Sequence, residues 1–229
     1  MKTAPSSPCD PMRASVGLGD PDRKLVVLLH GLGAAKEVQA REMGWLADAG
    51  YTAVTIDAPH HGERRGPLLD EIDRERNPAR RRSLIMDLVT QAAAEIPDLL
   101  RLFRGDGFAR IAVAGISLGG HTTFGAILHD PRPDVLVPLI ASPEWNRKPS
   151  PHEQVGRFAT IPTLAIVSRL DTIVPPDPCR VLFHRLSAAF PDAVDRLRIV
   201  EYPESGHVMR EEDWADAWRR IIAFLDRFL

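Results

Sequence analysis

The sequence has few cysteines and little net charge. Only two cysteines, Cys9 and Cys179, occur among 229 residues, whereas secreted proteins that depend on disulfides normally use more. We expect two free thiols, neither in a motif that would make it a nucleophile. The 29 lysines and arginines nearly balance the 31 aspartates and glutamates, for a formal net charge of −2. This balance argues against nucleic acid as a main partner, because phosphate binding needs an electropositive face.

Long apolar runs are also missing. No segment approaches the roughly 20 apolar residues of a membrane span, and the opening MKTAPSSPCDPMRAS lacks the apolar stretch of a secretory signal. We therefore predict no membrane partner and a cytoplasmic location. The composition, 44% hydrophobic and 26% charged, is typical of a globular protein. The length predicts one domain over 1–229, with 1–23 as an N-terminal extension or edge strand, and leaves monomer or homodimer open.

The chain alternates strand-like and helix-like segments. Short apolar runs predict strands at 25–29, 53–56, 111–114, 135–140, 163–168 and 197–202. Because most of them are apolar on both faces, they are typical of buried parallel strands. Amphipathic patterns between them predict a first helix that buries Val38, Leu46 and Ala49, and further helices at 83–103, 118–128, 181–189 and 214–228. The expected fold is α/β: a doubly wound, mostly parallel sheet with helices on both faces.

Two short segments interrupt this alternation of predicted strands and helices. Only 142–162 lies between the fourth and fifth predicted strands, which is too short for a large cap domain. The charged segment 60–82 is a candidate for a small flap. Its basic run, from Arg74 to Arg82, is offset by the nearby acidic residues Asp70, Glu71, Asp73 and Glu75. We interpret the run as a solvated helix face.

A candidate nucleophile follows the third predicted strand. Gly115-Ile116-Ser117-Leu118-Gly119 is a G-x-S-x-G sequence between a strand and a helix, the context that this motif requires. A serine at the tip of so sharp a turn needs tiny neighbours two residues away on each side, which the glycines provide. The alternative is a glycine-rich turn between a strand and a helix in which the serine has no catalytic role.

An oxyanion hole is predicted beside it. The first core strand ends in His30-Gly31-Leu32-Gly33, a loop that can present the backbone N–H of Leu32. The residue after the nucleophile, Leu118, can supply the second N–H donor that a tetrahedral intermediate needs. We expect His30 to hold this loop by hydrogen bonds rather than to act as a base.

A candidate acid and a candidate base accompany the candidate nucleophile. Asp171 follows the strand TLAIVS, and His207 follows the last strand, LRIVEY. The order Ser117, Asp171, His207 is the order expected where reactive groups gather at the carboxyl ends of parallel strands. His207 would take the proton of Ser117, and Asp171 would fix the imidazole tautomer. Capping roles for Asp171 and a surface position for His207 are the alternatives.

Together, HGLG, DAPHHG, GISLGG, LDTIVP and SGH resemble the motifs of the α/β-hydrolase family from about residue 25 to the C-terminus. The resemblance implies an ester, thioester or amide hydrolase with no metal or organic cofactor. It is strongest to the small esterases and to the dienelactone-hydrolase-like and peptidase-like branches. Dienelactone hydrolases, however, carry cysteine at the position of Ser117.

We predict that the chain is a serine hydrolase that cleaves small to medium carboxylic esters, with a small-molecule ester as its partner. His60, His61 and Trp145 are candidates for the pocket wall. Metal binding by His60, His61 and His121 is disfavoured, because no strand-anchored carboxylate accompanies them. An amidase or peptidase, a thioesterase, a perhydrolase and a non-catalytic binder on the same fold remain open.

Overall fold

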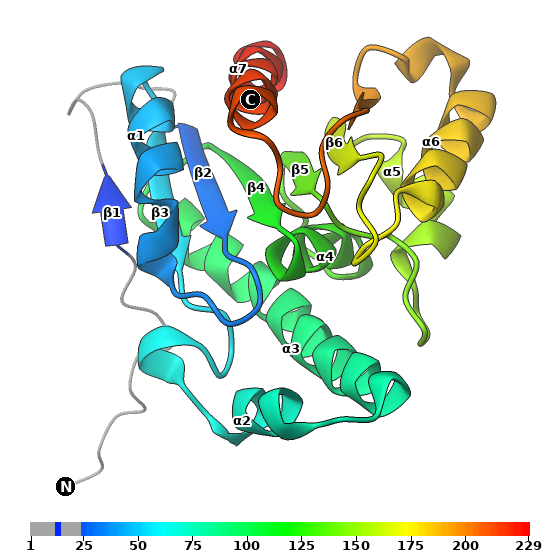
Figure 1. The fold of residues 1–229 in the computed structure, drawn as a ribbon. Coiled ribbons are helices and arrows are strands. Elements are labelled where there is room, and N and C mark those ends of the chain that lie inside the picture. The colour runs from blue at the N-terminus through cyan, green and yellow to red at the C-terminus, as the bar shows by residue number, and fades with distance from the viewer. Residues whose placement is uncertain (1–11, 15–23) are drawn as a thin grey trace, which may run out of the picture.

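A single sheet forms the centre of the computed structural model, which describes residues 12–14 and 24–229. Within these residues seven strands lie in the order β1-β3-β2-β4-β5-β6-β7. They are β1 (Met12–Ala14), β2 (Lys24–Leu29), β3 (Thr52–Ile56), β4 (Arg110–Ile116), β5 (Val135–Leu139), β6 (Thr163–Ser168) and β7 (Leu197–Tyr202). The six strands β2 to β7 are parallel, and β1 pairs antiparallel with β3 at one edge (Figure 1).

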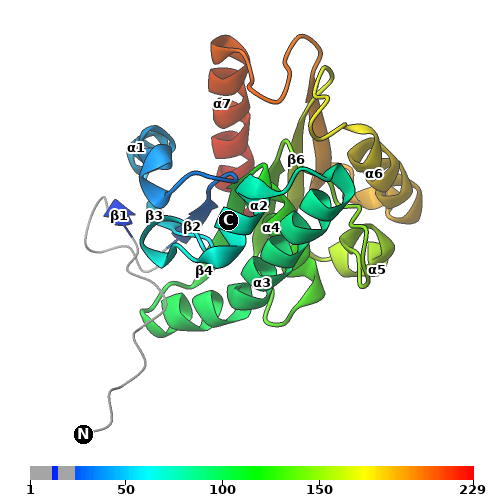
Figure 2. The same cartoon turned by 60° about the horizontal axis from the view of Figure 1, so that its bottom comes forward.

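Helices cover both faces of this sheet (Figures 1 and 2). One face carries α1 (Ala40–Asp48) and α7 (Glu211–Phe228), and the other carries α3 (Pro78–Gly105), α4 (Leu118–Gly125), α5 (Val155–Phe158) and α6 (Asp177–Ala189). The predicted doubly wound α/β architecture is confirmed. Short 3₁₀ turns lie at Lys36–Gln39, Gly62–Arg64, Ala126–Leu128, Pro151–Glu153 and Pro191–Ala193.

The central strand β2 shows why the strand segments are apolar throughout. Leu25, Val27 and Leu29 point into the core beneath α3 and α6, while Val26 and Leu28 point into the core beneath α1 and α7. Successive strand side chains face opposite sides of a sheet, so a strand with helices on both sides needs apolar residues at every position.

The structure corrects the predicted start of the second helix. Helix α3 begins at Pro78, before the predicted residue 83, because Asn77 caps it. The Asn77 side-chain oxygen accepts the N–H groups of Ala79 at 2.9 Å and Arg80 at 3.1 Å. Proline is tolerated in a first helical turn, where its missing N–H would have had no partner. The helix also continues through Pro97.

The structure also corrects the face of the first helix. Val38 lies in a 3₁₀ turn before α1 and is 64% exposed, and Ala49 is exposed at the end of the helix. Only Leu46 of the predicted residues is buried, together with Met43. The 3₁₀ turn breaks the α-helical spacing that had placed Val38 on the same face.

Segment 60–82 contains a helix of its own, α2 (Pro67–Arg74), which packs against α3. Leu69 and Ile72 are its buried residues, and Ile72 joins an apolar cluster with Met86 and Leu88 of α3. Between β5 and β6 the chain forms only a 3₁₀ turn and the short α5. No cap domain is inserted there.

The N-terminal part is described only at β1, which pairs with β3 at the edge of the sheet. The rest of segment 1–23, with Cys9, lies outside the described residues. Cys179 is a free and buried thiol. In the described ranges, no helix combines the length and the apolar character needed to cross a bilayer.

Because α7 packs on the sheet through Trp218, we expect truncation of this side chain to lower the stability of the protein strongly. Trp218 is 1% exposed and lies in the core beneath α1 and α7. Trp218→Ala should lower the free energy of unfolding by about 3–5 kcal/mol, the range for large buried aromatics. The neighbouring Arg219 is exposed, so Arg219→Ala should change the free energy of unfolding by less than about 0.5 kcal/mol. Urea unfolding of both variants checks this, and equal effects would contradict the assigned face.

Candidate active site

Ser117 lies at the tip of a strained turn between β4 and α4. Its backbone has φ 55° and ψ −109°, and a positive φ is uncommon for a residue other than glycine. The flanking glycines allow the turn to close. A Cβ on Gly115 would lie 2.2 Å from the carbonyl oxygen of Gly119, and one on Gly119 would lie 2.1 Å from that of Leu29. Strain of this kind persists only where the surroundings hold it.

Two backbone hydrogen bonds hold this turn between neighbouring strands. The N–H of Ser117 donates to the carbonyl oxygen of Leu139, at the end of β5, at 2.9 Å. The N–H of Gly119 donates to the carbonyl oxygen of His30, just after β2, at 3.1 Å. The seryl oxygen is therefore held above the carboxyl edge of the sheet.

A continuous chain of hydrogen bonds joins the three residues singled out in the sequence. Ser117 Oγ lies 3.0 Å from His207 Nε2, and His207 Nδ1 lies 2.8 Å from Asp171 Oδ2. The Asp171 side chain is only 1% exposed, and its Oδ1 accepts the N–H groups of Ile173 and Val174. With Nδ1–H donating to this carboxylate, Nε2 is left to accept the seryl proton.

The loop that carries His207 is anchored on both sides. Buried Ser205 donates its hydroxyl to Asp213 of α7 at 2.6 Å and accepts the N–H of Arg210 at 3.0 Å. Its carbonyl oxygen accepts the N–H of Leu170, which precedes Asp171, at 3.0 Å. The acid and base loops are therefore fixed to each other and to the start of α7.

Two free backbone donors lie beside Ser117. Leu118 is the first residue of α4, and Leu32 lies in the loop after β2. Within residues 12–14 and 24–229, neither N–H has a hydrogen-bond acceptor, as expected for a first helical turn in the case of Leu118. These are the two groups that the sequence predicts for an oxyanion hole.

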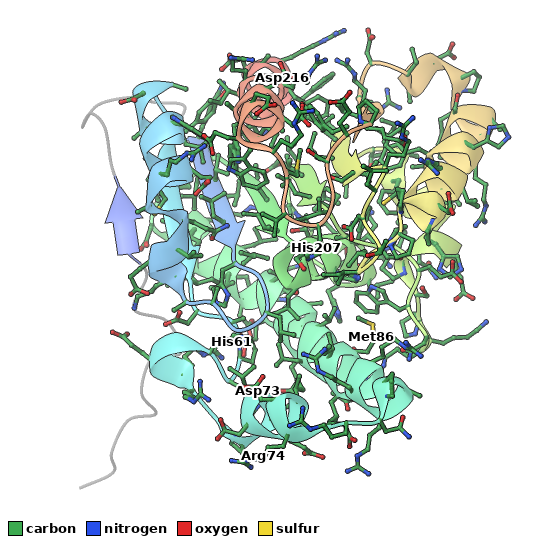
Figure 3. All side chains as sticks on the ribbon, viewed as in Figure 1. His61, Asp73, Arg74, Met86, His207 and Asp216 are labelled. Atoms are coloured by element: carbon green, nitrogen blue, oxygen red, sulfur yellow. The ribbon has the colours of Figure 1, made fainter. Side chains whose placement is uncertain are left out.

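Two neutral histidines brace the loop that contains Leu32. His61 Nε2 accepts the N–H of Gly33 at 3.0 Å, and its Nδ1 lies 2.9 Å from the carbonyl oxygen of Pro59. His30 Nε2 accepts the N–H of Ala58 at 3.0 Å. Burial lowers the pKa of both imidazoles, which favours the neutral form that accepts these bonds. Figure 3 labels His61 near the loop that follows β2.

A pocket of about 430 Å³ opens at the nucleophile. Its volume falls in the range of small-molecule sites. Figure 3 marks Met86 on α3 and His207 on the loop after β7, near this edge of the sheet. The lining residues are Leu32, Arg81, Arg82, Ile85, Met86, Ser117, Leu118, His121, Ser142, Glu144, Asn146, Ile173, Val174 and Pro175.

The three residues expected in the pocket wall do not border it, which corrects the prediction. Trp145 is 5% exposed and packs in the apolar cluster between α2 and α3, with its ring against the position of Gly125. His61 is buried and supports the loop that contains Leu32. The Nε2 atom of His60 lies 3.3 Å from Oε1 of Gln91 on α3. The sequence predicts on which loop each of these residues lies, but it does not predict in which direction its side chain points.

Most of the lining residues are not among the site residues predicted from the sequence, and Arg81, Arg82 and His121 are the ones that carry or can carry a positive charge. The basic run had been interpreted as a solvated face, and Arg80 and Arg82 are indeed exposed, but Arg81 and Arg82 also line the pocket. His121 lies one helical turn after Ser117, with Nδ1 2.9 Å from its carbonyl oxygen. Only this i+4 spacing could have indicated His121. Among the described residues, no three His, Cys, Asp or Glu side chains group to hold a metal ion.

Comparison with known proteins gives one family match and one relative by sequence. The model of the alpha/beta hydrolase family matches residues 26–228. The protein named "Putative esterase YitV" from Bacillus subtilis (strain 168) is 33% identical over 125 residues. This match covers 53% of the chain and 46% of that protein, so the chain spans about half the length of this relative.

Solved structures show the same fold at low sequence identity. A structure described as "Putative Dienelactone Hydrolase" from Klebsiella pneumoniae subsp. pneumoniae MGH 78578 has a TM-score of 0.76 and 20% identity, with 96% of this chain and 93% of that one covered. The monoacylglycerol lipase of Paleococcus ferrophilus has a TM-score of 0.70 and 17% identity, with 96% and 99% covered.

The close contact at Gly119 predicts that even one added methyl group will distort the turn. Gly119→Ala should lower the free energy of unfolding by about 1–3 kcal/mol or more, because the Cβ would meet the backbone of Leu29. Gly44 of α1 is a matched control, since a Cβ there meets no atom within 4 Å. Gly44→Ala should stabilise by about 0.5–1 kcal/mol. Thermal unfolding checks both signs, and stabilisation by Gly119→Ala would contradict the contact.

The neutral histidines predict a loss of stability in mild acid. The folded-state pKa of His61 is lowered, so below about pH 6.5 the unfolded chain binds protons that the folded protein does not. The free energy of unfolding should therefore fall between about pH 7.5 and 5.5, by up to about 1.4 kcal/mol per pH unit for each such histidine. His61→Gln removes one of these groups and should give a shallower slope. Parallel slopes in urea titrations would contradict a neutral His61.

Proposed function

The chain belongs to the alpha/beta hydrolase family, and from this premise we propose that it is a serine hydrolase that cleaves small to medium carboxylic esters through an acyl-enzyme on Ser117. One observation carries the proposal most directly: the hydrogen-bond chain from Ser117 through His207 to buried Asp171. The name "esterase" of the Bacillus subtilis relative supports ester substrates.

In the proposed acylation step, Ser117 Oγ attacks the ester carbonyl carbon while His207 Nε2 takes the hydroxyl proton. Asp171 stabilises the imidazolium that forms, because its carboxylate already accepts a hydrogen bond from Nδ1. The carbonyl oxygen becomes an oxyanion that accepts the free N–H groups of Leu32 and Leu118. Loss of one such donor typically costs roughly 3 kcal/mol of transition-state stabilisation.

Collapse of this intermediate breaks the bond to the alcohol. His207 returns its proton to the departing alkoxide, which leaves an acyl group on Ser117. A water molecule then attacks this acyl group, with His207 as general base, and the carboxylic acid and the free serine are released. Each proposed step uses side chains and backbone groups of the chain together with one water molecule, and the absence of a cofactor remains a prediction.

The pocket supports a compact substrate. Its volume of about 430 Å³ suits a small molecule, and Ile85, Met86 and Ile173 offer apolar surface to an acyl chain. The cytoplasmic location remains a prediction, as does the absence of nucleic-acid and membrane partners.

The same machinery could act on amides or thioesters, so we propose a direct comparison. Turnover of aminoacyl anilides at rates comparable with those of esters would favour an amidase or peptidase. A perhydrolase would instead show peroxide-dependent bromination. A non-catalytic binder would keep the pocket and hydrolyse none of these substrates.

Hydrolysis of p-nitrophenyl esters from acetate to laurate tests the proposal. Ser117→Ala should lower turnover by about 10⁴-fold or more, because the nucleophile is lost. Ser187→Ala is a matched control on the exposed side of α6 and should retain wild-type turnover. If wild type hydrolysed no ester and a fluorophosphonate probe failed to label Ser117, the binder would become the better interpretation.

A further inference from the structure

Two arginines in the first two turns of α3 line the same pocket as Ser117. Arg81 is half-buried and Arg82 is exposed, and both belong to the wall that continues as Ile85 and Met86 along the helix. This wall therefore has a cationic end and an apolar stretch. Apolar residues alone would suffice to bind an uncharged acyl chain.

Neither arginine is neutralised by the protein. In the part of the chain that the structure describes, no ion pair involves Arg81 or Arg82, whereas neighbouring Arg80 pairs with Glu71 and Glu75. Among residues 12–14 and 24–229, the only side-chain hydrogen bond of these two arginines runs from Arg81 Nε to the carbonyl oxygen of Ile72, at 3.2 Å. That bond orients the guanidinium and leaves its terminal amino groups for another acceptor.

The other charged and titratable groups of the lining leave this end cationic. Glu144 is the one carboxylate among the lining residues, and it forms no ion pair with either arginine in the described structure. His121 also borders the pocket, and burial lowers its pKa, which favours the neutral form. Two guanidinium groups against one carboxylate give the lining a net positive charge.

The position of the two arginines is unfavourable for the helix itself. The amino end of a helix carries partial positive charge and is stabilised by acidic residues. Helix α7 begins with Glu211, Glu212 and Asp213, and α6 begins with Asp177, but the first turn of α3 contains no acidic residue. Helix stability therefore does not account for the two arginines at this end of α3.

We propose that the substrate is an anionic ester: a molecule that carries a free carboxylate besides the ester bond. Arg81 and Arg82 bind this carboxylate by charge-assisted hydrogen bonds, while the apolar wall of α3 contacts the carbons between the carboxylate and the ester. The inference rests on the proposed ester hydrolysis and adds the substrate class. The two arginines act as specificity-determining residues, not as catalytic ones.

Two matched pairs of esters test this inference. Mono(4-nitrophenyl) adipate and its methyl-capped ester place the charge, or its neutral replacement, on the acyl side. The pair 4-acetoxybenzoate and methyl 4-acetoxybenzoate places it on the alcohol side. For each pair the ratio of kcat/KM for the anionic to the neutral ester is measured in the wild type and in each variant.

The double variant Arg81→Gln/Arg82→Gln should lower this ratio about 10- to 100-fold for at least one pair, the range for hydrogen bonds to charged groups. The single variant Arg82→Gln changes an exposed side chain that has no hydrogen bond or ion pair within the described residues, so it should lower the ratio in the same direction without affecting folding. Arg80→Gln removes a charge from the same turn but outside the pocket and should leave the ratio at the wild-type value. Equal ratios in wild type and double variant for both pairs would overturn the inference.

A binding measurement separates this inference from the proposed reaction. In the Ser117→Ala background, calorimetry with monomethyl adipate should show binding that the double arginine change weakens by a similar factor, while neutral dimethyl adipate binds independently of the arginines. If monomethyl adipate bound no tighter than dimethyl adipate, the inference would fail whatever the turnover. If all esters were inert but the anion still bound through the arginines, only the proposed hydrolysis would fail.

Discussion

The contact between Gly119 and the end of β2 is the constraint on which the candidate site depends. Because Gly119 has no side chain, the start of α4 packs directly on the backbone of Leu29, and its N–H donates to the carbonyl oxygen of His30. This contact holds Ser117 in a strained conformation at the pocket that Leu32 and Leu118 also line, and neither of their N–H groups has an acceptor within the described residues. Nucleophile and oxyanion donors are thus positioned by one piece of backbone packing.

The surrounding loops add support to this arrangement. His30 and His61 accept backbone N–H groups through Nε2, and burial lowers the pKa of both imidazoles, which favours the neutral form that accepts these bonds. On the other side, Ser205 fixes the His207 loop to α7 and to the loop of Asp171. Preorganisation of this kind lets donors and acceptors stabilise developing charge without first reorienting.

Much of this arrangement could be predicted from the sequence, because it depends on strand order. Buried parallel strands are apolar on both faces, and their carboxyl ends share one edge, so residues that directly follow strands are brought together. Ser117, Asp171 and His207 each follow a strand in this way. The geometry agrees with that expectation, and their catalytic roles remain proposals.

Side-chain direction in loops and helix ends could not be predicted in the same way. Trp145 and His61 turn into the protein because of tertiary contacts that leave no periodic pattern in the sequence. Asn77 starts α3 earlier than the apolar pattern indicates, so the basic run lies on this helix, where the packing of its apolar face brings Arg81 and Arg82 to the pocket.

The central claim is that Ser117 forms a covalent acyl intermediate, and trapping that intermediate tests it most directly. The protein would be mixed with p-nitrophenyl acetate, quenched in acid within the first turnover and digested for mass spectrometry. We expect one acetyl group on the peptide that contains Ser117 and none in Ser117→Ala, with a burst of nitrophenol equal to the enzyme concentration if deacylation is slower than acylation. Turnover by the wild type with the acetyl group on another residue, or equal turnover by Ser117→Ala, would contradict the account.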